Sequence, residues 1–232
     1  MNLLLLSNSR SPDGGYLTHA GEAITEVAGG RKRAVFIPYA GVTISWDDYT
    51  QKVQGVFSPL GIDVESAHQA ADPAALVAQA EIIVVGGGNT FKLLKCCREL
   101  GLLPLITGRV QAGAPYIGWS AGANLASPTI CTTNDMPIVD PGGFDALGLV
   151  SFQLNPHYTN ALPEGHQGET RDQRIAEYLV ANPAQRVFGL PEGDWLRVAD
   201  SQIKLYGPWP AKLFLSGQEP QAIDSPSQLS LG

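Results

Sequence analysis

Short apolar runs, several of which end in Gly, Pro or Asn, alternate along this chain with stretches of helical periodicity. The apolar runs cover residues 3–8, 34–38, 82–88, 115–119 and 186–193. The helical patterns cover residues 46–61, 89–100 and 169–182. Strands that alternate with helices form mostly parallel sheets, which the helices cover on both faces. The alternation therefore predicts a three-layer α/β fold with a mostly parallel, doubly wound sheet of the flavodoxin-like type.

The C-terminal part of the chain shows a different pattern. Apolar segments at 195–200, 202–207 and 211–217 are separated by turn-forming residues. This spacing is typical of antiparallel strands, and we expect them to join one edge of the sheet. The last dozen residues are expected to be frayed. A chain of 232 residues with 44% apolar side chains and no repeat or linker predicts one domain over residues 1–232.

Composition argues against several classes of protein. The longest leucine run, Leu3–Leu6, has neither a preceding basic region nor a following cleavage pattern, so we expect no membrane insertion. Three cysteines without a C-x-x-C pair favour a reducing compartment, which predicts a cytoplasmic protein. A net charge of −7 with no run of Lys or Arg argues against nucleic acid or an anionic membrane as partners. An anionic ligand would need a local basic residue.

The sequence Gly118-Trp119-Ser120-Ala121-Gly122 forms the pattern G-x-S-x-G between an expected strand and an expected helix. Ligands of parallel sheets bind at the carboxyl ends of the strands, where this turn would lie. The pattern is typical of a nucleophile elbow, a sharp turn that presents a serine hydroxyl above the sheet. The following helix would offer free N–H groups to a developing oxyanion. The alternative is an ordinary turn in which Ser120 is the N-cap of the helix.

A second glycine-rich turn, Val84–Thr90, also lies between an expected strand and an expected helix. Its three consecutive glycines would let backbone N–H groups approach a phosphate or an oxyanion closely. The phosphate interpretation is disfavoured, because the turn lacks the third glycine of the dinucleotide fingerprint and no Gly-Lys-Ser/Thr follows. Two interpretations of the turn stay open: it can form half of an oxyanion hole, or it can be a tight turn with an Asn cap.

A serine nucleophile needs a base, and the chain has four histidines, His19, His68, His157 and His166. His157 follows an apolar run and a proline, where the end of a strand would present its imidazole. His166 lies in a polar, glycine-rich loop, which suits closure over a substrate better than proton transfer. We therefore favour His157 as the base.

The base needs an acid to orient it, and the segment 190–195 offers Glu192 and Asp194. We favour Glu192, because it directly follows Leu-Pro at the expected end of a strand. Asp135 and Asp140 stay open, since triad members are brought together by the fold regardless of their spacing.

Arg171 and Arg174 lie at the start of an expected helix. Either arginine can belong to a solvated helix face. Arg171, close to the glycine-rich loop, can also bind a carboxylate through two parallel hydrogen bonds.

The chain resembles the peptidase E family, the cytosolic α-aspartyl dipeptidases of the serine type, over nearly its whole length. The segments that carry the resemblance are LLLLSNS, AVFIPYAGVT with WDDYT, VVGGGNTFKLLK, YIGWSAGANLA, TTNDMPIVDP, NPHYTNALPEGHQGETR and GLPEGDWL. The resemblance implies a fold similar to class I glutamine amidotransferases. It implies a triad at Ser120, His157 and Glu192, and an oxyanion hole at the N–H groups of Gly88 and Ala121.

The same resemblance implies that Arg171 binds the aspartate carboxylate of a dipeptide Asp-Xaa, the small peptide expected as substrate. The expected mechanism needs neither a cofactor nor a metal. The order Ser120, His157, Glu192 differs from that of α/β-hydrolases, in which the acid precedes the histidine.

Other functions stay open. A cyanophycinase-like serine hydrolase of other aspartyl substrates would share the elbow and the triad. A metal-dependent hydrolase would use His157, Glu164, His166 and Glu169, although their spacing matches no H-E-x-x-H pattern. A non-catalytic binder of small molecules would bind its ligand without turnover. The sequence does not define the oligomeric state, and a homo-oligomer remains among the options.

Overall fold

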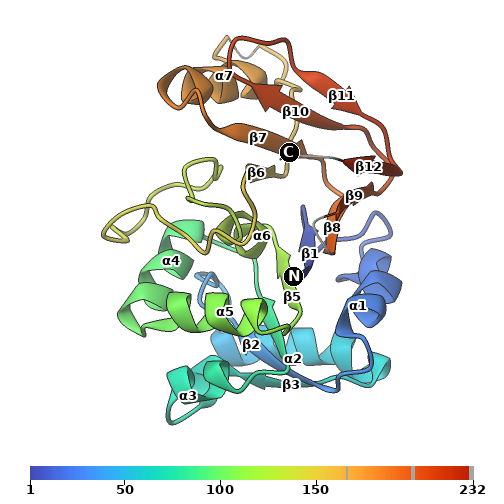
Figure 1. Ribbon diagram of the computed structural model, residues 1–232, viewed down its shortest axis with the longest axis vertical. Helices are drawn as coiled ribbons and strands as arrows, with labels where there is room; N and C mark the ends of the chain where they lie inside the picture. The colour runs from blue at the N-terminus through green and yellow to red at the C-terminus, as the bar shows by residue number, and fades with distance from the viewer. Residues whose placement is uncertain (166, 200–201, 230–232) are drawn as a thin grey trace.

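The computed structural model describes residues 1–165, 167–199 and 202–229, and its main feature is an eight-stranded sheet (Figure 1). The strand order is β12-β9-β8-β1-β5-β4-β2-β3. These strands are β1 (Asn2–Leu6), β2 (Arg33–Ile37), β3 (Asp63–Ser66), β4 (Ile82–Val85), β5 (Tyr116–Trp119), β8 (Trp195–Ala199), β9 (Gln202–Tyr206) and β12 (Ser227–Leu229). Neighbours from β1 to β3 are parallel, whereas β8, β9 and β12 add antiparallel pairs on the other side of β1. The mostly parallel α/β sheet predicted from the sequence is confirmed.

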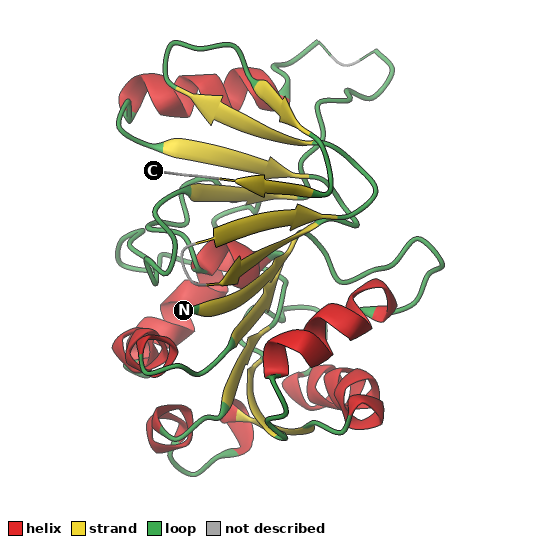
Figure 2. Cartoon of the chain, turned by 45° about the vertical axis from the view of Figure 1, so that its right-hand side comes forward, coloured by secondary structure: helices red, strands yellow, loops and turns green. Residues whose placement is uncertain are grey.

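Helices cover both faces of this sheet (Figure 2). One face carries α1 (Gly21–Ala28) and α2 (Trp46–Phe57), and the other carries α3 (Pro73–Ala78), α4 (Thr90–Glu99), α5 (Leu102–Gln111) and α6 (Ala121–Leu125). Short 3-10 helices lie at Thr18–Ala20, Ser58–Leu60 and Ala67–Gln69. No helix in the described part of the chain is both long and apolar enough to cross a membrane.

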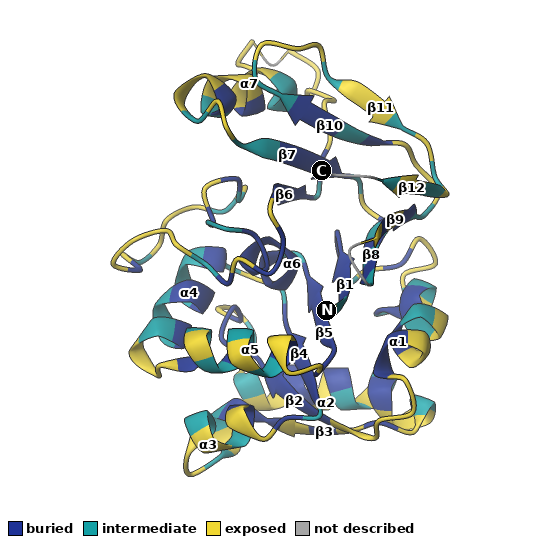
Figure 3. Cartoon of the chain, viewed as in Figure 1, coloured by how far each residue is buried: buried dark blue, intermediate teal, exposed yellow. Residues whose placement is uncertain are grey.

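The alternation of side chains along β1 explains the two helix layers. Leu3 and Leu5 pack into the core that contains α4 and α5, whereas Leu4 and Leu6 pack into the core that contains α1 and α2. Strands that are apolar on both sides are typical of parallel sheets between helix layers. Figure 3 shows β4 and β5 buried along their whole length for the same reason.

A smaller sheet holds four strands in the order β11-β10-β7-β6. The strands are β6 (Gln153–Pro156), β7 (Arg186–Leu190), β10 (Ala211–Leu215) and β11 (Gln221–Ile223), and α7 (Arg171–Ala181) packs against β10. β6 and β7 are parallel, and their register places Pro156 opposite Leu190. The ends of these two strands therefore lie side by side.

Two expectations for the C-terminal part of the chain are wrong. The sequence predicts 186–193 in the main sheet and 211–217 at its edge, but β7 and β10 pair with each other in the smaller sheet. Both faces of β7 are covered there, because Val187 packs with Leu179 of α7 while Phe188 packs into the main core. The expected fraying is also wrong for residues up to Leu229, because β11 pairs with β10 and β12 pairs with β9. The prediction of antiparallel strands is confirmed for β8 and β9, which extend the main sheet beyond β1.

Candidate active site

Ser120 occupies a strained turn between β5 and α6. Its backbone angles are φ 52° and ψ −114°, a conformation that residues other than glycine rarely adopt. The N–H of Ser120 donates to the carbonyl of Leu6 at the end of the neighbouring strand β1, at 3.0 Å. Ser120 does occupy the N-cap position of α6, but its side chain makes no capping hydrogen bond to the helix.

The two glycines of the G-x-S-x-G pattern are required by close backbone approach. A Cβ atom at Gly118 would lie 2.5 Å from the carbonyl oxygen of Gly122. A Cβ atom at Gly122 would lie 2.2 Å from the carbonyl oxygen of Val85 on β4. Neither oxygen can move without shifting a strand or a helix, so no side chain fits at either position.

His157 and Glu192 follow the two adjacent strand ends of the smaller sheet, β6 and β7. Nε2 of His157 lies 2.8 Å from Oγ of Ser120. Nδ1 of His157 lies 2.6 Å from Oε1 of Glu192. The structure therefore brings together the three residues that the sequence suggested, in the geometry that proton transfer from the serine to the imidazole requires.

A loop after β1 connects the two sheets at this point. The hydroxyl of Ser7 accepts from the N–H of His157 at 2.8 Å and donates to the carbonyl of Leu190 at 2.8 Å. The side-chain carbonyl of Asn8 accepts from the N–H of Gly193 at 2.8 Å. Ser7 and Asn8, which we call the β1 clamp, thus hold both the histidine and the turn that carries the glutamate. Nothing in the sequence pattern distinguishes these residues from other polar residues at a strand end.

The glycine-rich turn after β4 lies against Ser120. A Cβ atom at Gly87 would come within 2.8 Å of Cβ of Ser120. Gly88 has φ 137°, and a Cβ atom there would lie 2.2 Å from the carbonyl oxygen of Ala40. Ala121, the first residue of α6, follows the nucleophile directly. The turn also has the Asn cap expected from the sequence, since Oδ1 of Asn89 accepts from the N–H of Lys92 at 3.0 Å.

Arg171 is the first residue of α7, whose start is fixed by a capping box between Thr170 and Gln173. Its guanidinium donates to the side-chain carbonyls of Asn134 and Asn155. Burial, with a smaller effect of the nearby Arg174, lowers the pKa of Arg171. No Asp or Glu carboxylate among the described residues forms an ion pair with this half-buried cation. A guanidinium in this state can bind an anion that enters from outside.

Two hollows join the nucleophile to this arginine. Ser120 and His157 line a small pocket together with Thr133 and Asn134. Arg171 lines a cavity of about 390 Å³ that includes the same Thr133 and Asn134. The hollow beside the serine and the cavity of the guanidinium therefore adjoin at Thr133 and Asn134. Asn134 and Asn155 were not singled out by the sequence, where they are two asparagines among several.

The position of Arg171 is supported through its neighbour in the helix. Asp172 accepts from Tyr158, the residue after the histidine, and from Nζ of Lys212 on β10 at 2.8 Å. These contacts tie α7 to the strand ends that carry the site. Sequence spacing gave no signal for them, because the three residues are far apart in the chain.

The competing candidates have other partners. Asp194 is fully buried and accepts from the N–H of Trp209, and Asp140 accepts from the N–H of Gly142. Asp135 accepts from the N–H and the hydroxyl of Thr90 at 2.7 and 2.6 Å. None of these carboxylates forms an ion pair with His157 in the described part of the chain.

The remaining histidines and basic residues also have other environments. The ring of His19 contacts Ser11, and that of His68 contacts Ser66 and Asp47, so neither joins the site. Arg174 forms a solvent-exposed ion pair with Glu169. His166 lies outside the described residues.

A serine, a histidine and a glutamate joined by hydrogen bonds at the ends of strands form the arrangement of a serine hydrolase. Residues 3–206 of the chain match the family model "Peptidase family S51". The chain belongs to this family, and it is a serine-type dipeptidase.

Similar proteins can be aligned with almost the whole chain. Peptidase E of Citrobacter koseri is 58% identical over 225 residues, which are 97% of this chain and 98% of that protein. Peptidase E of Salmonella heidelberg is 59% identical with the same coverage. The crystal structure of a peptidase from an acI-B1 Actinobacterium has the same fold, with a TM-score of 0.72 at 19% identity over 99% of this chain and 96% of that chain. The predictions of family, fold class and serine-type peptidase activity are confirmed.

Proposed function

We propose that the protein hydrolyses dipeptides with an N-terminal aspartate through an acyl-enzyme formed on Ser120. The observation that carries this proposal is the guanidinium of Arg171. It is half-buried, it has no carboxylate partner in the described part of the chain, and its cavity adjoins the pocket of Ser120. A desolvated cation without a counter-charge favours an anionic ligand group, and the side chain of aspartate supplies one.

In the first half of the reaction, Nε2 of His157 takes the proton of Ser120 while Oγ attacks the carbonyl carbon of the aspartyl residue. Glu192 accepts a hydrogen bond from the Nδ1–H group of His157, which fixes the tautomer and stabilises the imidazolium. The N–H groups of Gly88 and Ala121 donate to the oxyanion. When the C–N bond breaks, His157 gives its proton to the leaving amine.

In the second half, a water molecule replaces the amine. His157 takes a proton from this water, whose oxygen attacks the acyl carbon, and the oxyanion forms again between the same two N–H groups. The C–O bond to Ser120 then breaks and His157 returns the proton to Oγ. Free aspartate leaves, and the enzyme is regenerated.

Specificity for aspartate rests on Arg171 and on the start of α7. A net charge of −7 repels an acidic substrate at long range, so the local cation must outweigh the overall field. The N-terminus of a helix adds partial positive charge next to the guanidinium. Asparagine has nearly the same shape as aspartate but leaves the cation without a counter-charge, so discrimination against it can reach about 10⁴.

The alternatives are less well supported. Membership of the S51 family does not favour a cyanophycinase-like hydrolase. Of the side chains considered for a metal site, Glu169 pairs with Arg174, both ring nitrogens of His157 have partners, and His166 is outside the described residues. We also propose that residues 1–232 act as one domain, because the β1 clamp bonds to the turn that carries Glu192.

The test compares kcat/KM for Asp-Leu and Asn-Leu in the wild type, in Arg171→Ala and in Arg33→Ala. Arg171→Ala is expected to lower kcat/KM for Asp-Leu by about 10² to 10³, the scale for removing one partner of a desolvated charge pair. Arg33 pairs with Glu81 at the surface and makes the same change in net charge, so its loss should cost less than about threefold. Full preference for Asp over Asn in Arg171→Ala would contradict the proposal.

A further inference from the structure

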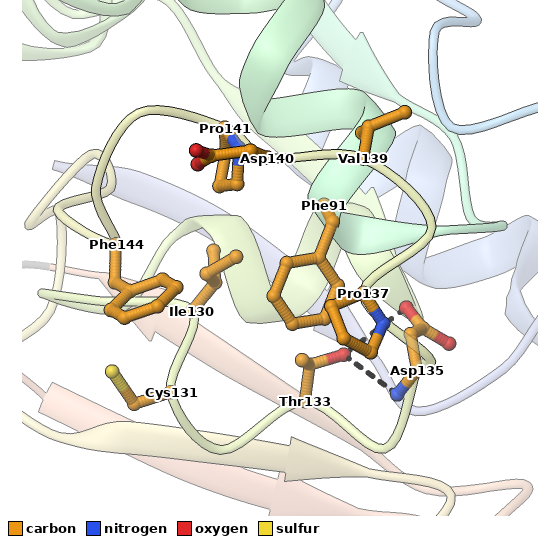
Figure 4. Close-up of a pocket in the computed structure, with 10 residues that line it drawn as sticks. All are labelled: Phe91, Ile130, Cys131, Thr133, Asp135, Pro137, Val139, Asp140, Pro141 and Phe144. Atoms are coloured by element: carbon orange, nitrogen blue, oxygen red, sulfur yellow. Dashed lines mark hydrogen bonds between the residues drawn. The ribbon is translucent and has the colours of Figure 1, made fainter.

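A second, apolar cavity of about 500 Å³ lies beside the active site (Figure 4). Its walls come from α4 and from the long loop between α6 and β6. Six of its lining residues are apolar: Phe91, Ile130, Pro137, Val139, Pro141 and Phe144. Phe144 remains 52% exposed, whereas Ile130 is fully buried. A hollow with this lining binds an apolar group more strongly than a polar one.

The cavity adjoins the catalytic pocket along one short segment. Thr133 lines the apolar cavity, the pocket of Ser120 and the cavity of Arg171, and Asp135 lines the first two. The segment is held in place, because Oδ2 of Asp135 accepts from Thr90 and the hydroxyl of Thr133 donates to both Thr90 and Asp135. The apolar cavity and the arginine cavity are therefore separate hollows that meet at the same residue beside the nucleophile.

The loop that forms the cavity is fixed to the body of the protein by hydrogen bonds. The guanidinium of Arg98 on α4 donates to the carbonyls of Gly142 and Asp145 at 2.8 and 2.9 Å. The side chain of Asn89 donates to the carbonyl of Met136 at 2.8 Å, and the N–H of Ile130 donates to the carbonyl of Phe144 at 2.9 Å. These contacts define the shape of the hollow.

We propose that this cavity is the subsite for the second residue of the dipeptide, and that it selects a large apolar side chain. This inference rests on the proposed function, because it assumes that the aspartate carboxylate occupies the cavity of Arg171. The Cα atoms on either side of a scissile trans peptide bond are about 3.8 Å apart, so a dipeptide whose carbonyl lies at Ser120 must direct its two side chains into neighbouring hollows. With the arginine cavity filled by aspartate, the apolar cavity receives the side chain of the leaving residue.

Charge at the subsite sharpens the expected preference. Among the described residues, the lining includes the carboxylates of Asp135 and Asp140 and no Lys or Arg. The cations nearby on α4 have their own partners: Lys95 pairs with Glu99, and Arg98 bonds to loop carbonyls. An acidic second residue would meet negative charge and an apolar wall, so dipeptides such as Asp-Glu should be poor substrates.

The experiment measures kcat/KM for Asp-Leu, Asp-Phe, Asp-Ala and Asp-Glu. The wild type is expected to prefer Asp-Leu and Asp-Phe to Asp-Ala by about 10- to 100-fold, the scale for burying a large apolar side chain. Phe144→Ala should lower the ratio of Asp-Leu to Asp-Ala by roughly fivefold, because one wall of the hollow is lost. Phe144→Lys should raise Asp-Glu relative to Asp-Leu, a gain that a merely weakened fold would not produce.

Ile138→Ala is the matched control, because Ile138 lies in the same loop with 50% exposure but does not line the cavity. Its ratio of Asp-Leu to Asp-Ala should equal that of the wild type. A wild type that cleaves Asp-Ala as well as Asp-Leu would overturn the inference. An unchanged ratio in Phe144→Ala, or an equal change in Ile138→Ala, would overturn it too. Failure of the proposed function looks different, since the wild type would then cleave none of these aspartyl dipeptides better than their asparaginyl counterparts.

Discussion

The turn that carries the nucleophile and the turn that carries the acid are held in place by different means. Ser120 is fixed by close packing of main chain, since Gly118 and Gly122 lie where any Cβ would strike a backbone oxygen. His157 and the turn that carries Glu192 are fixed by hydrogen bonds with the β1 clamp, Ser7 and Asn8. A turn that is held by close packing does not depend on pH, but it tolerates no added atoms. Hydrogen-bonded fixing tolerates small changes and depends on each polar partner.

The largest expected effect comes from removing the nucleophile itself. Ser120→Ala should lower kcat by on the order of 10⁶, the scale for losing the nucleophile of a triad. The backbone strain at this position adds a second readout. Ser120→Gly should be equally inactive but more stable than Ser120→Ala by about 1 kcal/mol, because glycine adopts φ 52° more readily. Steady-state kinetics and urea unfolding measure the two effects, and equal stability of the two variants would refute steric strain at the nucleophile.

The turn that carries Glu192 also contains Asp194, which should make the stability of the protein depend on pH. The turn that carries Ser120 should make no such contribution. Asp194 is fully buried, its Oδ2 has no partner among the described residues, and burial raises its pKa from 3.8 to about 7. Between about pH 4 and pH 7 the folded protein holds this proton while the unfolded chain has lost it, so stability falls as the pH rises through this range. The contribution is at most on the order of 4 kcal/mol.

Asp194→Asn tests this dependence, since asparagine keeps an acceptor for Trp209 but does not titrate. The free energy of unfolding, measured in urea from pH 4 to pH 8, should fall less with pH in the variant than in the wild type. Identical pH profiles would show that Asp194 is ionised throughout.

Gly122→Ala tests the steric side of the comparison. The added methyl group would lie 2.2 Å from the carbonyl oxygen of Val85, so we expect a loss of about 3 kcal/mol in stability, together with displacement of Ser120 and loss of activity. Gly55→Ala, in the exposed part of α2 with no atom near the added Cβ, is the control and should be slightly stabilising. Equal thermal unfolding midpoints for the two variants would contradict steric fixing.

Ser7→Ala tests the polar side and has the smallest expected effect. It removes the acceptor of the His157 N–H and the donor to Leu190, which should cost about 1 to 2 kcal/mol in stability and roughly tenfold in kcat. Ser66→Ala, which removes an equally buried serine at the end of β3, should affect stability alone. A kcat in Ser7→Ala equal to that of Ser66→Ala would show that the clamp does not position the histidine.

The same difference explains what could be predicted from the sequence. The nucleophile turn was predictable, because steric demands fix residue types at fixed spacing, as in the glycines around Ser120. His157 and Glu192 were predictable as the polar residues that follow strand ends. Ser7, Asn134 and Asn155 were not, since their partners lie across the fold and any polar residue of the right length looks the same in the sequence.

The fold shows the same limit. Periodicity identified β1, β2, β4 and β5, whose strands are apolar on both sides. It could not separate β7 and β10 from the main sheet, because a strand in the smaller sheet has the same apolar pattern as one in the larger. β11 pairs with β10 and β12 pairs with β9, and neither pairing leaves a local signal in the sequence.

The position of β1 has a consequence for how the protein is made. This first strand lies between β5 and β8, and Ser7 bonds to the chain near residue 190. During synthesis, β1 therefore lacks one neighbour until β8, about 190 residues later in the chain, has left the ribosome. A chain that stops before Glu192 has a serine in its elbow but no complete triad beside it, so the peptidase becomes competent only after this residue has been added.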